Sequence, residues 1–239
     1  GNVVIALLPA VLASALIFGA RALLLVVVTT FACVAFEYIY ERLLHKTNTV
    51  GDLSAVVTGI ILALNMPVGM PIWIAVVGAF VAIVITKQLF GGLGYNFANP
   101  ALVGRIVLFL GFTSRMTAYV YPDMAVDALA SATPLASSVD RHAVSLLDMF
   151  LGLHGGMMGE VCVLAILLGF AYLVATKTIQ ATIPVTIVAT VFILTTLNTG
   201  DPYAALSGER AGHVVGRHKD RAEQQAAGHA LDQGSVGIA

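Results

Sequence analysis

Apolar residues follow one another in seven segments along the chain, separated by short polar or glycine- and proline-containing links. The segments comprise residues 3–20, 22–40, 53–66, 71–87, 97–113, 159–175 and 181–198. The first two approach the roughly 20 apolar residues with which a helix crosses the hydrocarbon layer of a membrane. Only Arg21 separates these two segments. The pattern therefore predicts a bundle of helices in which the first two are joined by a tight turn.

Two of the seven segments are too short to cross a bilayer as regular helices. Segment 53–66 has 14 residues and would rise only about 21 Å at about 1.5 Å per residue. Segment 97–113 follows a run with three glycines, and it contains an Asn-Pro step and Arg105. Short apolar segments beside glycine and proline are typical of discontinuous helices, whose free backbone groups line a cavity. We therefore predict an all-α, polytopic integral membrane domain over residues 1–208, with several short, broken helices.

The composition supports a membrane protein and excludes several other classes. Hydrophobic residues make up 59% of the 239 residues and charged residues only 10%, whereas about a quarter of the residues in soluble domains are charged. The formal net charge is -1, and no basic stripe is present, so we expect no nucleic-acid partner. Cys33 and Cys162 lie in separate apolar segments and form no metal-ligand pattern, so we expect no metal site.

Basic residues near the segment ends predict an orientation in the membrane. If the seven segments alternate, one side receives Arg42, Lys46, Lys87 and Lys177, and the other receives Arg21, Arg115 and Arg141. Because the cytoplasmic side has the excess of Lys and Arg, we expect the N-terminus inside and loop 114–158 outside. Residues 209–239 are polar and lack a hydrophobic period, which is typical of a disordered tail. A changed reading frame after residue 208 is a second interpretation of this tail.

Loop 114–158 contains the hydroxyl-rich stretch "DALASATPLASS", residues 127–138. Thr133 stands between Ala132 and Pro134, and a proline keeps the residue before it extended. Asp127 precedes it by six residues and could accept hydrogen bonds from an incoming group. By itself this stretch has two interpretations, a solvated loop or a point of chemical attachment, and local sequence alone favours the loop.

Ionisable and amide side chains beside the short segments are further candidates for a binding site. Gly159 allows close approach to the backbone, and Glu160 either complements a helix dipole or serves a function at the membrane border. Asn96 and Asn99 could bind a ligand or cap the broken helix. Arg105 could bind a phosphate or carbonyl, reach the membrane surface, or pair with a carboxylate.

Two acidic residues, Glu37 and Glu41, lie four residues apart near the end of the second segment. Residues at this spacing lie on the same face of a helix. Their position beside Arg42 predicts that both lie at the membrane interface.

Several ordered motifs resemble one family of membrane proteins. They are "VVIALLPA", "GDLSAVVTGIILALNMP", "KQLFGGLGYNFANPALVGR", "DALASATPLA" and "GGMMGEVCVLAILLGFAYL". Across residues 2–208 they resemble the RnfD component of Rnf electron-transport complexes and the related NqrB component of sodium-translocating NADH:quinone oxidoreductases. The resemblance implies an inverted-repeat helical fold similar to that of urea transporters, which residues 1–208 would complete only in part.

The resemblance also implies a cofactor, FMN joined through its phosphate to Thr133. The family motif has an aspartate, a hydroxyl residue, Gly, Ala and Thr, and the corresponding positions here are Asp127, Ala130, Ser131, Ala132 and Thr133. Ala130 and Ser131 depart from this pattern. We expect the surroundings of the flavin to include Asn96, Asn99, Arg105, Gly159 and Glu160. A second, non-covalent flavin such as riboflavin is a further possibility that the resemblance leaves open.

The role implied by the resemblance is that of a redox subunit that does not catalyse a reaction alone. It would relay electrons in a ferredoxin:NAD oxidoreductase complex of the inner membrane and couple them to Na⁺ or H⁺ transport. Its partners would be the other subunits, membrane lipid and a flavin transferase. A non-redox solute channel with similar helices is the alternative, and a structural subunit without flavin is a third hypothesis.

Overall fold

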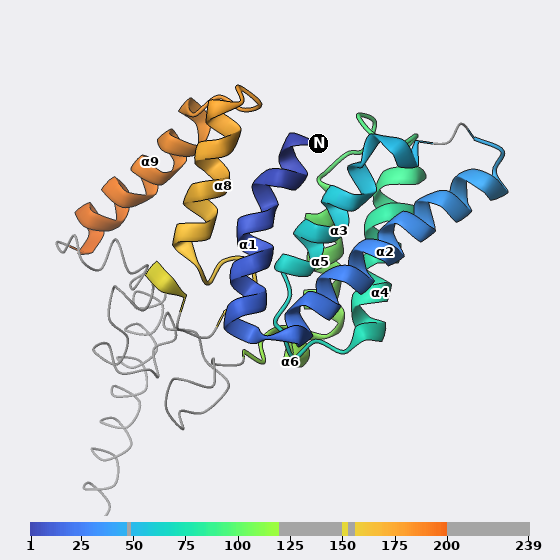
Figure 1. Cartoon of the computed structure of the whole chain (residues 1–239), viewed down its shortest axis with the longest axis horizontal. Helices are drawn as coiled ribbons and strands as arrows, with labels where there is room; N and C mark the ends of the chain where they lie inside the picture. The colour runs from blue at the N-terminus through green and yellow to red at the C-terminus, as the bar shows by residue number, and fades with distance from the viewer. Residues whose placement is uncertain (47–48, 120–149, 153–155, 200–239) are drawn as a thin grey trace, which may run out of the picture. The chain divides into compact units, whose positions relative to one another are not determined.

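The computed structural model describes residues 1–46, 49–119, 150–152 and 156–199, and every regular element in this part of the chain is helical. The elements are α1 (Asn2–Phe18), α2 (Ala20–Leu43), η1 (Val50–Asp52), α3 (Ser54–Leu64), α4 (Ile72–Phe80), η2 (Val81–Gln88), α5 (Pro100–Gly111), α6 (Thr113–Met116), α8 (Val163–Ala175) and α9 (Thr182–Thr199). The chain divides into two compact units, of which the first contains α1 to α8 and the second contains α9 (Figure 1). Each of the seven predicted segments corresponds to a helix or to a continuous pair of helices.

A single glycine makes the turn between α1 and α2. Gly19 has φ 73°, a left-handed conformation that favours glycine, and α2 begins at the next residue. Arg21 lies within the first turn of α2, where its guanidinium donates a hydrogen bond to the carbonyl oxygen of Met70 at 3.1 Å. The predicted tight turn is therefore confirmed, although the residue that makes it is Gly19.

Helix α2 occupies a central position in the first unit and packs against α1, α3, α4 and η2 (Figure 1). Small residues let these helices approach closely, a property common at helix interfaces in membranes. A Cβ atom added to Gly59 of α3 would lie 2.6 Å from Cα of Thr30 on α2. A Cβ atom added to Gly169 of α8 would clash with the carbonyl oxygen of Ala6 on α1. The positions of these glycines thus set the spacing of two helix pairs.

The helices differ in length in the way that the sequence predicts. In the described part of the chain, Ala20–Leu43 is long and apolar enough to cross a membrane, and the other apolar helices are shorter. Helix α3 has 11 residues and α5 has 12. Asn99 caps α5, and Pro100 occupies its first turn, where the missing N–H is not needed. The expectation of short helices over 53–66 and 97–113 is confirmed.

Candidate functional site

A cluster of polar side chains lies between α2, the C-terminal end of η2 and the N-terminal end of α3. Nζ of Lys87 lies 2.5 Å from Oε1 of Glu37, and the exposed fractions of the two side chains are 1% and 0%. The same ammonium group donates to Oγ of Ser54 at 2.5 Å. Glu41, one turn further along α2, is also buried, with an exposed fraction of 4%. Two carboxylates and one lysine thus share a site that bulk water does not reach.

Further hydrogen bonds hold both carboxylates in place. Nε2 of Gln88 donates to Oε1 of Glu37 at 3.0 Å and to Oε1 of Glu41 at 3.3 Å. The backbone N–H of Thr49 donates to Oε2 of Glu41 at 3.1 Å, and its hydroxyl lies within hydrogen-bond distance of both carboxylates. Oε2 of Glu37 is buried and has no partner among the described residues. We call Glu37, Glu41, Thr49, Ser54, Lys87 and Gln88 the acidic cluster.

The backbone of η2 presents Lys87 and Gln88 to the cluster together. Residues Val81–Gln88 form a π-helix that continues α4 without a break. Backbone hydrogen bonds five residues apart mark its geometry, including the one from the N–H of Leu89 to the carbonyl oxygen of Val84 at 3.0 Å. Insertions of π-helix in α-helices are rare and occur frequently at functional sites. This geometry supports a functional role for the cluster.

The charges of the acidic cluster do not balance when both carboxylates are ionised, since two negative charges then face one positive charge. The other charged side chains at its border are exposed. Lys46 donates to the carbonyl oxygen of Gln88 at 3.4 Å, and Asp52 accepts hydrogen bonds from Ser54. An uncompensated charge is very unfavourable in a buried site. With both carboxylates ionised, the side chains of the acidic cluster would carry a net charge of -1, next to the exposed Lys46.

The prediction that Glu37 and Glu41 lie at the membrane interface beside Arg42 stays a prediction, but neither side chain is exposed as an interfacial residue would be expected to be. Both face the interior of the first unit, because η2 packs against α2 and brings Lys87 to them. The sequence contained a signal for a buried ion pair, since two acids four residues apart and a lysine at the end of an apolar segment have opposite charges. That Lys87 pairs with Glu37 could not be deduced, because 50 residues separate them.

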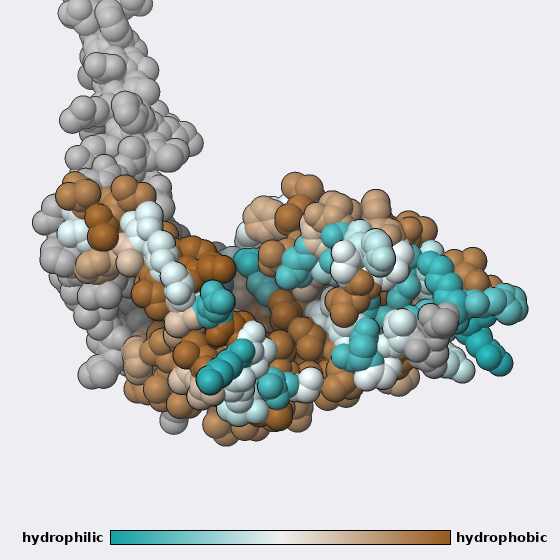
Figure 2. All heavy atoms as spheres, turned by 90° about the horizontal axis from the view of Figure 1, so that it is seen from above, coloured by the Kyte–Doolittle hydropathy of each residue, from teal (hydrophilic) through white to brown (hydrophobic). Residues whose placement is uncertain are grey.

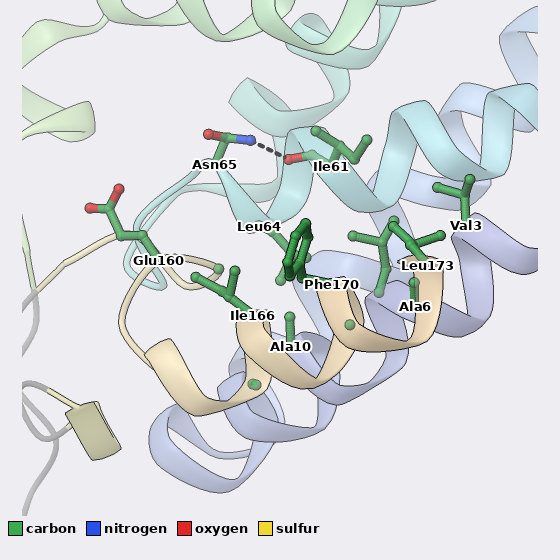
Figure 3. Close-up of a pocket in the computed structure, with 14 residues that line it drawn as sticks. Val3, Ala6, Ala10, Ile61, Leu64, Asn65, Glu160, Ile166, Phe170 and Leu173 are labelled. Carbon is green, nitrogen blue, oxygen red and sulfur yellow. Dashed lines mark hydrogen bonds between the residues drawn. The ribbon is translucent and has the colours of Figure 1, made fainter. Parts of the chain in front are cut away.

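A pocket of about 360 Å³ lies between α1, α3 and α8 at the other end of α3 (Figure 3). Its walls are mainly apolar. Small residues, including Ala6, Ala10 and Gly169, form part of its wall, and Phe170 extends into it. Gly159 and Glu160, both predicted site residues, line it, and Asn65 stands with Glu160 at one end. The pocket can accept a flat, largely apolar group.

Polar groups gather at the end of the pocket that contains Asn65. Nη1 of Arg105 donates to Oδ1 of Asn65 at 2.7 Å, and the amide of Asn65 donates to the carbonyl oxygen of Ile61. Burial raises the pKa of Tyr119, the Glu160 carboxylate raises it further, and Arg105 opposes both effects. Arg105, Glu160 and Tyr119 therefore interact electrostatically.

The predicted site residues of α5 and α8 have different local roles. Oδ1 of Asn99 accepts from the backbone N–H of Ala101 at 3.0 Å, so the capping interpretation is confirmed for this residue. Asn96 bonds within its own loop, and neither asparagine lines the pocket. Arg105 bonds to an amide, and it has no carboxylate within ion-pair distance in the described part of the chain.

The interpretation of Glu160 as a first-turn carboxylate is wrong. Helix α8 begins only at Val163, and Glu160 accepts a hydrogen bond from the N–H of Met157 at 3.1 Å in the turn before it. The remaining predicted site residues, Asp127, Ser131, Ala132 and Thr133, lie outside the described residues, as does the predicted tail 209–239.

The described residues form a helical bundle with charged groups buried between its helices. Comparison with known proteins defines the family. Residues 1–215 match the model of the NQR2, RnfD, RnfE family. The chain belongs to this family.

Three relatives illustrate the similarity. The chain is 44% identical to the D component of the Na(+)-translocating ferredoxin:NAD(+) oxidoreductase complex of Acetobacterium woodii, over 84% of this chain and 64% of that protein. It is 35% identical to the D component of the proton-translocating ferredoxin:NAD(+) oxidoreductase complex of Clostridium ljungdahlii, over 84% and 66%. It is 37% identical to the B component of the Na(+)-translocating NADH-quinone reductase of Pseudomonas aeruginosa, over 68% and 41%. The chain thus spans about two thirds of the length of the first two.

Proposed function

We propose that this chain is a membrane subunit of an ion-translocating ferredoxin:NAD oxidoreductase complex of the Rnf type, located in the inner membrane. The family and the names of the two ferredoxin:NAD oxidoreductase relatives support this assignment. The structural observation on which it rests is the buried ion pair between Lys87 and Glu37 beside a second acid, Glu41. Ionisable groups buried among apolar helices mark ion or proton pathways in membrane proteins.

The surface of the helices supports a position in lipid. Large apolar side chains are exposed on them, including Leu12 at 62%, Leu16 at 86% and Leu110 at 75%. Hydrophobic residues cover much of the face seen in Figure 2, and large exposed apolar patches mark contacts with membrane or with other proteins. The exposed apolar side chains thus support a polytopic membrane domain over residues 1–208. The proposal also includes an inverted-repeat architecture, contacts with the other Rnf subunits, and loop 114–158 on the outer side.

The acidic cluster would bind the transported ion. Because its side chains would carry a net charge of -1 with both carboxylates ionised, a proton or Na⁺ can compensate this charge, and the names of the two ferredoxin:NAD oxidoreductase relatives include both ions. Oε2 of Glu37 offers an oxygen with no partner among the described residues. Lys87 competes for the same carboxylate as a tethered cation. This competition weakens binding of the ion, so that an ion taken up by the cluster can also be released.

We include FMN attached to Thr133 in the proposal, next to Asp127, Ser131 and Ala132. The pocket fits the ring of a flavin, since its walls are apolar and its polar groups lie at one end, as the flat body and polar edge of the ring require. Gly159 and Glu160 would contact the ring from the turn before α8. The bound flavin would supply one- and two-electron transfer, while these residues would orient it and exclude water. Asn96 and Asn99 do not line this pocket and remain candidates for contacts with the flavin elsewhere.

Ion transport by the assembled complex tests the proposed function. Membrane vesicles with Glu37→Gln in this chain should lose ion uptake driven by reduced ferredoxin and NAD, by roughly tenfold or more, because the change removes a charge from the cluster. Asp52→Asn is the matched control, since it makes the same chemical change at an exposed acid of the border. Ion uptake by Glu37→Gln equal to that of Asp52→Asn, in complexes of equal abundance, would contradict the proposal.

A further inference from the structure

Three buried side-chain oxygens in the described part of the chain have no hydrogen-bond partner, and all three belong to α2. They are Oγ1 of Thr29, Oγ1 of Thr30 and Oε2 of Glu37. Buried polar groups are nearly always paired, and an exception indicates an ordered water or an ion. Because all three oxygens belong to α2, the missing hydrogen-bond partners are expected along the buried face of this helix.

The polar side chains of α2 form a row. Thr29, Cys33, Glu37 and Glu41 follow one another at intervals of four residues, which places them on one face. All four are buried, with exposed fractions of at most 4%. The row rises about 18 Å over its twelve residue steps at about 1.5 Å per residue. This is more than half of the roughly 30 Å hydrocarbon layer, so the row extends from the acidic cluster to the middle of the first unit.

Thr29 of this row and its neighbour Thr30 differ from four other threonines in the described part of the chain. The hydroxyls of Thr58, Thr176, Thr186 and Thr196 each donate to the backbone carbonyl four residues earlier, at 2.7 to 2.9 Å. This local bond is the usual way in which a threonine satisfies its hydroxyl inside a helix. Thr29 and Thr30 do not make it. Their hydroxyls are therefore available for a partner outside their own helix.

Water has the right size to be that partner. Residues four apart on a helix have Cβ atoms about 5–6 Å apart, which is too far for a direct hydrogen bond but matches two bonds through one water. The oxygens of Glu37 and Thr29, with the thiol of Cys33 between them, provide the polar contacts that a buried water requires. Thr30 adds a further oxygen where α2 and α3 approach closely at Gly59.

We propose that water molecules occupy the buried face of α2 between Glu37 and Thr29 and give the ion bound by the acidic cluster a hydrated route into the centre of the bundle. The proposed water rests on the unpaired oxygens and does not depend on the function of the complex. The role of the water as an ion route rests on the proposed function of the complex.

Radiolytic labelling of the assembled complex tests the hydration directly. Hydroxyl radicals formed from water by an X-ray pulse oxidise sulfur side chains next to that water, and mass spectrometry locates the oxidised residue. After each rate is divided by the intrinsic reactivity of its side chain, which is higher for cysteine than for methionine, Cys33 should be oxidised several-fold faster than the fully buried Met66 and Met70. Oxidation of Cys33 as slow as that of these methionines would overturn the proposal without any variant.

A variant that lacks one hydroxyl tests the presence of the water and its role in ion transport separately. Thr29→Val keeps the shape of the side chain, and it should lower the labelling of Cys33 and slow ion uptake several-fold. Thr58→Val is the matched control, because that hydroxyl already bonds to its own helix, and it should change neither. If Thr29→Val lowers the labelling but leaves ion uptake unchanged, the route is wrong. If it leaves the labelling unchanged, the position of the water is wrong. If Glu37→Gln abolishes ion uptake but Cys33 is labelled as slowly as the buried methionines, the proposed function is supported and the proposed water is wrong.

Discussion

The two ends of α3 lie in opposite chemical environments. Ser54 begins the helix inside the acidic cluster, and Asn65 follows its last residue at the apolar pocket. The 11 residues between these ends span about 16 Å at about 1.5 Å per residue. At the first end, buried charges compensate one another through direct bonds. At the second end, the walls are mainly apolar, and Asn65 and the charged Glu160 lie together at one edge. A short helix thus separates a site suited to an ion from one suited to a neutral ring.

The largest expected effect comes from leaving the acidic cluster without its lysine. Lys87→Met leaves Glu37 and Glu41 buried without a counter-charge, which should destabilise the protein by about 3–5 kcal/mol. Thermal unfolding of the chain in the purified complex measures this loss. Lys46→Met is the matched control, because this lysine is exposed and exposed charges contribute only about 0–1 kcal/mol.

A double substitution sharpens this prediction. Lys87→Met combined with Glu37→Gln removes both charges of the pair, so it should recover part of the stability lost in Lys87→Met alone. If the double variant is as unstable as the sum of the two single variants, the ion pair does not couple these residues.

An intermediate effect is expected at the pocket. Gly169→Ala places a methyl group against the carbonyl oxygen of Ala6, so α1 and α8 must separate, at a cost of about 1–3 kcal/mol. The attached flavin should remain, with a changed visible absorption spectrum in the native complex. Gly111→Ala is the control, since a Cβ atom there meets nothing within 4 Å.

The covalent attachment of the flavin to Thr133 is measured separately from the position of the flavin ring in the pocket. The flavin fluorescence of the denatured chain in a gel should persist in Gly169→Ala and disappear in Thr133→Ala. A dark band from the wild-type chain in the presence of an active flavin transferase would reject the attachment and favour the non-redox channel. An unchanged native spectrum in Gly169→Ala would place the ring elsewhere.

The smallest effect is electrostatic and concerns Tyr119. Burial and the carboxylate of Glu160 raise its pKa, so Glu160→Gln should move its titration to lower pH. A raised pKa stabilises the folded protein below the ordinary pKa of tyrosine, about 10, and this contribution is lost as the pH rises through the folded value. The absorbance of tyrosinate, taken as the difference from Tyr119→Phe, measures the titration. No shift in Glu160→Gln would show that Glu160 does not contribute to this end of the pocket.

The helices could be predicted from the sequence because long apolar runs have few alternatives to helix in a membrane. The predicted segment 71–87 is an example, as it matches Ile72–Gln88 closely. Its change from α to π geometry at Val81 could not be predicted, because that change depends on packing against α2 and α5.

The candidate sites were predicted only in part. Gly159 and Glu160 were identified from their motif, and they do line a pocket. Asn65 was missed because, at the end of an apolar segment, it has the position of an ordinary helix terminus. The burial of Glu37 was not foreseen, since its partner is a lysine 50 residues away. Local patterns predict helices and their ends, whereas pairs of distant residues follow from the packing of those helices.

The buried ion pair also imposes an order on synthesis. Glu37 leaves the ribosome 50 residues before Lys87, which is roughly 3 to 10 s at 5–20 residues per second. During this interval Glu37 lacks the lysine with which it pairs, and burying its carboxylate in an ionised state is unfavourable. The burial of Glu37 beside Lys87 is therefore expected to be completed only after η2 has been made.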